Sequence, residues 1–584
     1  MDREIKDCQN CKAPFEIDSA DFAFYAKMDV PPPTWCPECR MIRRMAFWNE
    51  RNFFKRIDEG GKAILSTYPQ ESPHKVIDRD FWWSDKFDAA SYGRDYDFSR
   101  PFFEQFGELL LSVPLPSRLT VGLVNSDYSN ASDYIKNCYM CFNASTSEDC
   151  FYGVFFTDSR DSVDVLDSDW LESSWEIYSG GNCYRVFYGA RVSDCRDSYF
   201  LYNCSNVSDC FGCVNLRHKQ YHIFNEPYSR EDYFRKLKEM NLGSHASFER
   251  WRKEFREFVL KFPHKYINGL SNVNVSGDDI NQAKDVKESY EIYEAENIAY
   301  CQSVGQHTKD SYDFTNWGRA SQLVYESVDC GSSSRGLKFC SGCFSGCRDL
   351  EYSISCFSSE NCFGCVGLKK KKYCIFNKQY SKEEYEKLRA KIVEHMNVMP
   401  YVDKLGRIYK YGEFFPLAMA PFAANETAIM DFTDMTMEKA LRYGLAWRES
   451  KTSEYKITIL SKDLPDHIKD VAESVTKEAI GCTNCKQAYR IIPKELEFYK
   501  RFQIPLPRLC HNCRFKERIK QRNFPKLFSR NCQCAGAMSE NGIYKNTVEH
   551  IHGVSICPNQ FKTAYSPDKP EIIYCEKCYQ QEVV

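Results

Sequence analysis

Two long stretches of the chain, residues 120–224 and 272–376, show the pattern of short strands rather than of helices. Aromatic and small residues alternate in runs such as NCYMCF, DCFYGVFF and DCFGCV, and Ser, Asp, Asn or Gly separate the runs. Many short strands with repeated turn signals predict a coiled β-solenoid, with a sandwich or barrel as the alternative. The tandem arrangement of the two stretches favours the solenoid.

The two stretches resemble each other in detail. Residues 209–237 (DCFGCVNLRHKQYHIFNEPYSREDYFRKL) align with residues 361–388 (NCFGCVGLKKKKYCIFNKQYSKEEYEKL) at an offset of 152. We interpret this as an internal duplication. Ser229 and Ser381 are each followed three residues later by an acidic residue, the spacing of a capping box, so each copy is expected to end in a helix. A further amphipathic helix is predicted over residues 246–262.

The two ends of the chain also resemble each other. Near the start, CQNC and CPEC are separated by 24 residues, and near the end CTNC and CHNC have the same separation. A single offset of 474 aligns both modules without a gap. The paired cysteines are Cys8, Cys11, Cys36 and Cys39 in the first module and Cys482, Cys485, Cys510 and Cys513 in the second.

Paired CxxC turns place four thiolates around one tetrahedral position with no room for a water ligand. Such a site is structural, and its metal supplies folding energy that a module of this size lacks. We therefore predict a zinc ribbon at each end. A third site, at the C-terminus, is predicted from Cys557, Cys575 and Cys578, with Cys532 or Cys534 as first ligand and His550 and His552 as nearby spare donors. The total is about three Zn²⁺ per chain.

The C-terminal module has a counterpart after the first ribbon. An offset of 497 places Cys557 on Gly60, Cys575 on Asp78 and Cys578 on Phe81, and the first ligand falls near Ile57. The counterpart therefore lacks metal ligands. We expect the aromatic residues 81–83 to fill the space that a metal would organise.

A basic and aromatic segment follows each ribbon. It could track phosphates and stack on bases, or it could be a solvated helix whose aromatics pack on the ribbon. The first interpretation requires a contiguous basic face. Its candidate nucleic-acid-binding residues are Arg40, Arg43, Arg44, Arg51, Arg514, Lys516, Arg518 and Arg522.

Composition and charge exclude some classes of protein and indicate the compartment. The 584 residues carry 78 basic and 81 acidic side chains, a net charge of −3, which excludes a globally basic nucleic-acid coat. No apolar run approaches the length of a membrane span. The charged start, MDREIKDCQN, predicts no export signal and a cytoplasmic protein, where the 30 cysteines stay reduced and zinc is favoured over disulfides.

Seventeen of the cysteines lie in the two middle stretches. They could form further metal or redox sites, or they could be small buried residues stacked inside the solenoid. The second interpretation is favoured, because only the CxxC pairs 210/213 and 362/365 correspond between the copies.

No catalytic motif is present: the chain lacks GxGxxG, GxxxxGK[ST], HExxH and GxSxG. Three functions remain. The first is a zinc-binding, non-catalytic scaffold that binds protein partners along its solenoid. The second is nucleic-acid binding, to RNA or the ribosome, through the basic segments. The third is an enzyme without a local motif. A small-molecule substrate is not expected.

The fold class expected is mainly β with α+β parts, a duplicated cysteine-rich β-solenoid flanked by terminal zinc-ribbon modules. The domains expected are a zinc ribbon at 1–56, a degenerate second ribbon and linker at 57–119, solenoid copies with helical tails at 120–270 and 271–400, a mixed α/β unit at 401–480, a zinc ribbon at 481–531 and a zinc-binding module at 532–584.

The segments CQNCKAPFEI, NERNFFKR, YGRDYDFSRPFFEQF and YGEFFP, together with CFGCVNL and YHIFN, resemble a family of large cysteine-rich proteins of candidate-phyla bacteria with zinc-ribbon domains. The resemblance implies architecture rather than activity. Members usually keep Cys where this chain has Ile57, Gly60, Asp78 and Phe81. Some are labelled CaiB/BaiF-type CoA-transferases, and no residue here supports that label.

Overall fold

The computed structural model describes residues 3–449 and 455–583, which form two compact units. Unit 1 comprises Met1–Arg118, Ile267–Arg448 and Phe524–Leu527, and unit 2 comprises Leu119–Tyr266, Glu449–Asn523 and Phe528–Val584. The predicted 401–480 segment includes residues 450–454, which lie outside the described part. The boundaries of the seven domains expected from the sequence remain predictions.

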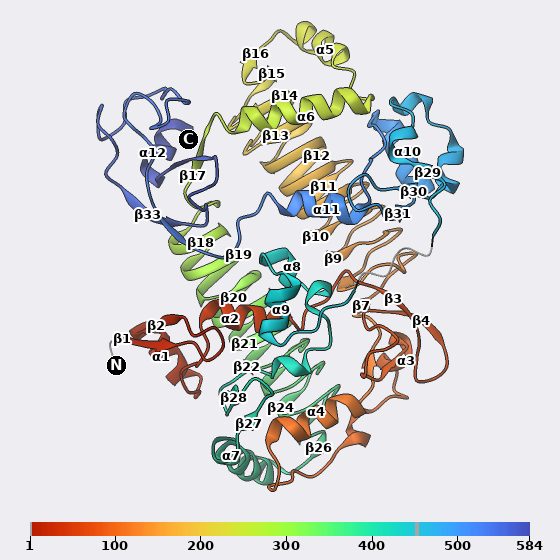
Figure 1. The fold of residues 1–584 in the computed structure, drawn as a ribbon, viewed down its shortest axis with the longest axis vertical. Coiled ribbons are helices and arrows are strands. Elements are labelled where there is room, and N and C mark those ends of the chain that lie inside the picture. The colour runs from red at the N-terminus through yellow and green to blue at the C-terminus, as the bar shows by residue number, and fades with distance from the viewer. Residues whose placement is uncertain (1–2, 450–454, 584) are drawn as a thin grey trace. The chain divides into compact units, whose positions relative to one another are not determined.

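The body of unit 2 is a ten-stranded sheet wound into a solenoid (Figure 1). Neighbouring strands are parallel, and partners such as Val163 and Trp175, or Ser208 and Gln220, lie twelve residues apart, so one turn takes twelve residues. The last strand alone pairs antiparallel. The strands are β7 (Thr120–Val121), β8 (Ser132–Asp133), β9 (Phe142–Ser145), β10 (Val154–Thr157), β11 (Val163–Glu172), β12 (Trp175–Ser193), β13 (Arg196–Tyr202), β14 (Ser208–Val214), β15 (Gln220–Ile223) and β16 (Glu226–Pro227).

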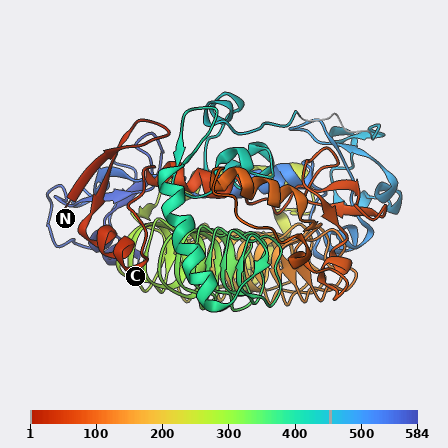
Figure 2. The same ribbon diagram turned by 90° about the horizontal axis from the view of Figure 1, so that it is seen from below.

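Every third residue along this solenoid has a left-handed backbone with positive φ, as at Asn137, Met140 and Asn143. This pattern of positive φ continues through most of the body. Two extended residues followed by one left-handed residue turn the chain at each third position. A twelve-residue turn therefore has four corners. Figure 2 shows the turns stacked on one another.

The solenoid interior is built from residues three apart, such as Cys138, Cys141 and Ala144, which are all buried. Small side chains are required because four short walls enclose little space. Buried serines link successive turns: the Ser147 hydroxyl donates to the Ser145 carbonyl at 2.8 Å and accepts the N–H of Ser159 at 3.0 Å, one turn later. The buried hydroxyl of Ser147 is thereby satisfied both as a donor and as an acceptor.

The body of unit 1 is a nine-stranded solenoid of the same kind. Three consecutive turns, from Lys309 to Gln322, Arg335 and Arg348, take thirteen residues each, and the next two take twelve. The strands are β18 (Val273–Asn281), β19 (Lys284–Ala299), β20 (Gln302–Gly318), β21 (Gln322–Gly331), β22 (Arg335–Lys338), β23 (Arg348–Glu351), β24 (Glu360–Phe363), β25 (Lys372–Ile375) and β26 (Lys378–Gln379).

The longer turns change the correspondence between the two solenoids. The offset of 152 holds at the CFGC segments, and each thirteen-residue turn upstream reduces it by one. Lys309 in unit 1 therefore corresponds to Arg160 in unit 2, an offset of 149. By the same offset Asp313 corresponds to Asp164, a pair that matters below.

The helices that flank unit 1 begin as the sequence predicted: α7 (Lys382–Val398) starts at a capping box of Ser381 and Glu384. Its other elements are β1 (Arg3–Asp7), β2 (Pro14–Asp18), α1 (Ser19–Lys27), α2 (Pro37–Met45), β3 (Phe54–Ile57), β4 (Ala63–Ser66), β5 (Val76–Ile77), α3 (Arg79–Trp83), η1 (Ala89–Tyr92), α4 (Phe102–Ser112), β6 (Leu115–Pro116), β27 (Tyr401–Val402), β28 (Ile408–Tyr409), η2 (Leu417–Met419), η3 (Ala424–Glu426), α8 (Ile429–Phe432) and α9 (Met437–Tyr443).

In unit 2, Ser229 caps α5 (Arg230–Glu239), and the predicted amphipathic helix is α6 (His245–Val259). The remaining elements are β17 (Pro263–Lys265), β29 (Ile459–Leu460), η4 (Ser461–Asp463), η5 (Ile468–Asp470), η6 (Glu473–Lys477), β30 (Ile480–Gly481), β31 (Ala488–Tyr489), α10 (Pro493–Phe502), α11 (His511–Ile519), β32 (Phe528–Asn531), β33 (Gln560–Thr563), β34 (Ile572–Tyr574) and α12 (Glu576–Val583).

The predicted fold class is confirmed: the protein is mainly β, with a solenoid body and cysteine clusters near both ends of the chain. In the described part of the chain, every helix is too short or too polar to traverse a bilayer.

Candidate metal centres

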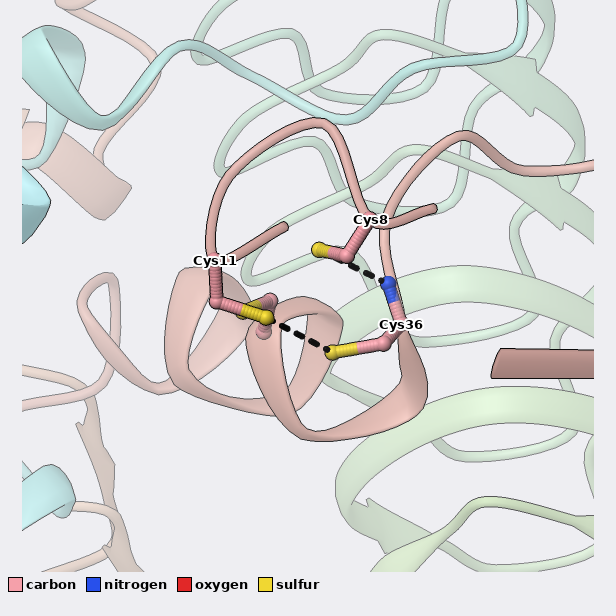
Figure 3. Close-up of side chains that lie close together, drawn as sticks. Cys8, Cys11 and Cys36 are labelled. Carbon is pink, nitrogen blue, oxygen red and sulfur yellow. Dashed lines mark hydrogen bonds between the residues drawn. The ribbon is translucent and has the colours of Figure 1, made fainter. Parts of the chain in front are cut away.

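The first cysteine group lies in unit 1 between the β1–β2 hairpin and α2. Lys12 adopts a left-handed backbone (φ 65°) that closes the turn after Cys11, and its N–H donates to the Cys8 carbonyl. Cys36 precedes Pro37, which opens α2, so Cys36 and Cys39 both lie at the helix start. The Sγ atoms of Cys11 and Cys36 are 3.7 Å apart (Figure 3). All four ligand atoms lie within 4.8 Å of one another.

The second group, Cys482, Cys485, Cys510 and Cys513, repeats this geometry in unit 2. Lys486 is left-handed (φ 62°) after the first pair, and the second pair opens α11. The Sγ atoms of Cys485 and Cys510 are 3.6 Å apart. The four ligand atoms again lie within 4.8 Å of one another.

Backbone N–H groups prepare both sites for thiolates. The Cys36 N–H donates to Cys8 Sγ at 3.2 Å (Figure 3), and the Cys510 N–H donates to Cys482 Sγ at 3.3 Å. Burial raises the pKa of the Cys482 thiol, but N–H donors from Cys510, Cys485 and Asn484 outweigh it and lower the pKa to about 7. Four converging sulfurs with no open position fit a tetrahedral ion such as Zn²⁺.

Two overlapping groups occur in the C-terminal module of unit 2. Cys532, Cys557, Cys575 and Cys578 form one group, and Cys534, His550, His552 and Cys578 form the other. The sequence left open whether Cys532 or Cys534 is a ligand. In the structure each belongs to a group, and the two histidines belong with Cys534. The HxH spacing at 550–552 was the available signal for this second group.

The module at residues 57–119 has no such group, and hydrogen bonds hold its corresponding turn. Asp58 aligns with Cys532 at the offset of 474, and Asp78 aligns with Cys575 at the offset of 497. The Asp78 N–H donates to Asp58 Oδ2 at 2.9 Å, just as the Cys575 N–H donates to Cys532 Sγ at 3.2 Å. Asp58 Oδ1 also accepts the N–H groups of Gly60 and Lys62. A carboxylate thus replaces the thiolate.

The aromatic residues 81–83 behave differently from one another. Trp82 is fully buried, its indole N–H donates to the Pro114 carbonyl, and its ring contacts Phe87. Phe81 is 46% exposed. The expectation that all three fill the missing metal's space is therefore wrong for Phe81.

The arginines after the first ribbon are buried in a charge cluster within unit 1. Arg40 Nη2 lies 2.9 Å from Asp313, and Arg44 Nη1 lies 3.0 Å from the same carboxylate. Arg43 bridges Glu326 at 3.1 Å and Glu413 at 2.8 Å. Three positive charges thus face three negative charges, all nearly inaccessible to solvent. The helix α2 is thereby fixed on β20 and β21, as Figure 1 shows.

Unit 2 contains the corresponding cluster beneath α11. Arg514 Nε lies 2.8 Å from Asp164 and its Nη2 lies 3.3 Å from Glu495, while Arg518 Nη2 lies 2.9 Å from Asp164. All four side chains are buried. Glu495 also accepts hydrogen bonds from the hydroxyls of Tyr152 and Tyr499.

The prediction that these residues form a contiguous basic face for nucleic-acid binding is therefore wrong. The side chains of Arg40, Arg43, Arg44, Arg514, Arg518 and Arg522 are buried, and Arg51 is paired with Asp431 at 2.6 Å. Lys516 alone of the eight candidates is exposed. The acidic partners were missed because they lie up to 380 residues away along the chain, where no local pattern marks them.

The solenoid cysteines are buried and form none of the potential metal groups among the described residues. Each in unit 2 points inward, and its S–H donates to backbone oxygen: Cys204 Sγ lies 3.4 Å from the carbonyl oxygens of both Tyr202 and Cys213. Burial raises the pKa of Cys204 well above that of a free thiol. These cysteines act as small packing residues.

Comparison with known proteins adds little. No protein-family model matches the chain, and no curated protein matches it. A crystal structure from Desulfovibrio desulfuricans G20, named for an acetyltransferase activity, aligns with 50% of this chain and 86% of its own at 9% identity, with a TM-score of 0.10. A superposition of that quality carries no argument about fold or activity.

Proposed function

We propose that this protein is a zinc-binding, non-catalytic scaffold. Each metal-stabilised ribbon packs on a solenoid and stabilises it, and the solenoid binds protein partners. The observation that carries the proposal is the pair of buried, charge-balanced clusters beneath α2 and α11. They commit the basic helices of both ribbons to internal packing. A ribbon packed in this way stabilises the solenoid and does not bind a ligand through its basic helix.

Zinc is the metal we propose because all four donors in each ribbon are thiolates arranged around one closed position. Soft sulfur donors in a tetrahedral set select Zn²⁺ or iron. A closed site has no coordination position for a substrate, so the role assigned to the metal is structural.

The solenoid of unit 2 offers a surface for partners. The aromatic side chains of Tyr134 and Trp170 are 63% and 55% exposed. They lie 36 residues apart, three turns of twelve, and therefore fall in one column of the solenoid wall. Exposed aromatics on a rigid surface are typical of protein-binding sites.

The surface is tested by placing a photo-crosslinking residue at position 134 or 170 of the full chain in its native host. A discrete crosslinked protein at both positions is expected. Arg196, exposed on the same solenoid but in another column, is the matched control. An identical crosslinking pattern at position 196, or none at 134 and 170, would contradict the proposal.

The nucleic-acid alternative is tested separately with the same metal-loaded protein. Binding to mixed RNA and DNA is measured across a salt titration. Because the arginines are buried, we expect no salt-sensitive binding to nucleic acid. Steep salt dependence that is lost in a Lys516→Ala variant would favour the alternative.

A further inference from the structure

The C-terminal module contains a long connection that regular structure does not stabilise. Residues 535–556 form no helix or strand, and isolated bridges at Cys534–Ser539 and Met538–Lys545 are their only ladder contacts among the described residues. Connections of this length are ordered only when something fixes them. His550 and His552 lie within this connection.

Both histidines direct a nitrogen at a cysteine. His550 Nδ1 lies 3.0 Å from Cys534 Sγ, and His552 Nε2 lies 3.4 Å from Cys578 Sγ. These four ligand atoms lie within 4.8 Å of one another. In a tetrahedral site with Zn–S near 2.3 Å and Zn–N near 2.0 Å, neighbouring ligand atoms are separated by about 3.3–3.8 Å. The group is therefore close to the size that an ion requires.

The other nitrogen of each ring is already committed. His552 Nδ1 lies 2.7 Å from the Ser555 carbonyl, which can only accept, so the proton is on Nδ1 and the lone pair of Nε2 faces the cysteines. His550 Nε2 lies 2.9 Å from Glu582 Oε1, which leaves Nδ1 free toward Cys534. An acceptor behind the ligating imidazole is the usual arrangement at metal sites.

Glu582 is itself fixed in place. Its carboxylate accepts hydrogen bonds from the Thr547 N–H at 3.0 Å and the Tyr544 hydroxyl at 3.0 Å. On the sulfur side, Asn546 Nδ2 donates to Cys534 Sγ at 3.2 Å. Tyr574 in turn donates to the Asn546 side chain at 2.8 Å. Cys534, His550 and His552 therefore each have a supporting partner.

The first group of this module is complete without the histidines. Cys532, Cys557 and Cys575 surround Cys578, whose Sγ lies 3.6 Å from Cys557 Sγ. Cys578 lies in the first turn of α12 and is the single residue common to both groups. A thiolate has lone pairs enough to bind two ions at once, so the groups need not compete.

We propose that the C-terminal module holds two divalent ions, with the Cys578 thiolate bridging them: one bound by Cys532, Cys557 and Cys575, the other by Cys534, His550 and His552. Sulfur and imidazole donors in closed sets select Zn²⁺. This inference goes beyond the scaffold role and raises the total from about three ions per chain to four. The second ion anchors the 535–556 connection against α12.

The count is tested by native mass spectrometry of the full chain loaded with Zn²⁺. Wild type is expected to carry four ions, and the double variant His550→Ala/His552→Ala three. His307→Ala, which removes an exposed histidine outside every group, is the control and should keep four. Three ions in wild type, unchanged in the double variant, would overturn the binuclear centre while leaving the two ribbons and the scaffold proposal intact.

The bridge is tested by substitution with Co²⁺. Two cobalt ions that share a thiolate couple magnetically, so the paramagnetic signal per cobalt is expected to be lower in wild type than in the double histidine variant. Equal signals per ion, at four ions per chain, would refute the bridge. Glu582→Gln keeps every ligand and is expected to lower the affinity for the second ion 10–100-fold in chelator competition. This variant provides a test even if the double histidine variant misfolds. Unchanged competition would also contradict the assignment.

Discussion

The buried carboxylate Asp313 is the sharpest test of how the ribbon is held in unit 1. It accepts from Arg40 at 2.9 Å and Arg44 at 3.0 Å, and its side chain has no solvent exposure. Asp313→Asn keeps the shape but leaves three buried arginines facing two carboxylates. Removing one partner of a buried ion pair typically destabilises a protein by about 3–5 kcal/mol.

The remaining contacts set where in that range the loss falls. Glu326 lies 3.4 Å from Arg40 and 3.7 Å from Arg44, and Arg44 also donates to Thr315 and Gln302. These partners stay in place, so we expect a loss near the lower limit, about 3 kcal/mol.

The corresponding change in unit 2 should cost more. Asp164→Asn removes the carboxylate that pairs with both Arg514 and Arg518, and Glu495 remains for Arg514 only. Its loss should approach about 5 kcal/mol. Both variants make the same exchange of one carboxylate oxygen for an amide nitrogen, at corresponding positions, so each controls for the other.

Hydrogen exchange detected by mass spectrometry is the suitable assay, because a protein of two units need not unfold in one step. Asp313→Asn should deprotect α2 together with β20 and β21, and Asp164→Asn should deprotect α11 together with β11. A loss below about 1 kcal/mol in both variants would refute the reasoning, because the charges would then be screened as at an open surface. So would a larger loss for Asp313→Asn than for Asp164→Asn.

Three further predictions concern the metal sites, a buried acid and the solenoid cysteines. Cys11→Ser or Cys485→Ser should remove one ion and unfold its own ribbon while leaving the solenoid folded, and digestion of the whole chain in limited proteolysis would contradict this. Burial and the charge of Asp329 raise the pKa of Glu50 to about 8, so unit 1 should lose stability as pH rises from about 4.5 to about 8. Glu50→Gln should flatten this pH dependence, measured as urea unfolding midpoints. An unchanged slope in the variant would exclude Glu50 as the cause. In native protein a thiol reagent added with a chelator should modify no more than the thirteen terminal cysteines, and reaction of the seventeen solenoid cysteines before unfolding would show that the interior is open.

The ribbons could be predicted from sequence because their chemistry is local. Two CxxC pairs at equal spacing define a site whatever lies around it, and the turn after each pair follows from the same few residues. The solenoid was predictable as a class, but its repeat was not identified. Cys138, Cys141, Ala144, Ser147 and Cys150 mark an interior residue at every third position. The intervening aromatics give an apparent alternation of two that conceals this period.

The role of the basic segments could not be predicted in the same way. Arg40 and Arg44 are four residues apart, so both lie on one face of α2, and any local reading must choose between solvent and a ligand. The structure provides a third option, because Asp313 lies some 270 residues further along the chain. Local composition cannot distinguish a basic helix that binds phosphates from one that neutralises a distant buried carboxylate.

The charge clusters also explain how each ribbon selects its position. Arg40 and Arg44 meet Asp313, and their counterparts Arg514 and Arg518 meet Asp164, the aligned residue once the three longer turns are counted. Any other docking of α2 would bury up to three arginines without partners, and each uncompensated charge costs several kcal/mol. A purely apolar interface would tolerate a shift of one turn along a repetitive solenoid, since neighbouring turns present similar side chains. The ion pairs do not, and we infer that they define the register at which each ribbon binds.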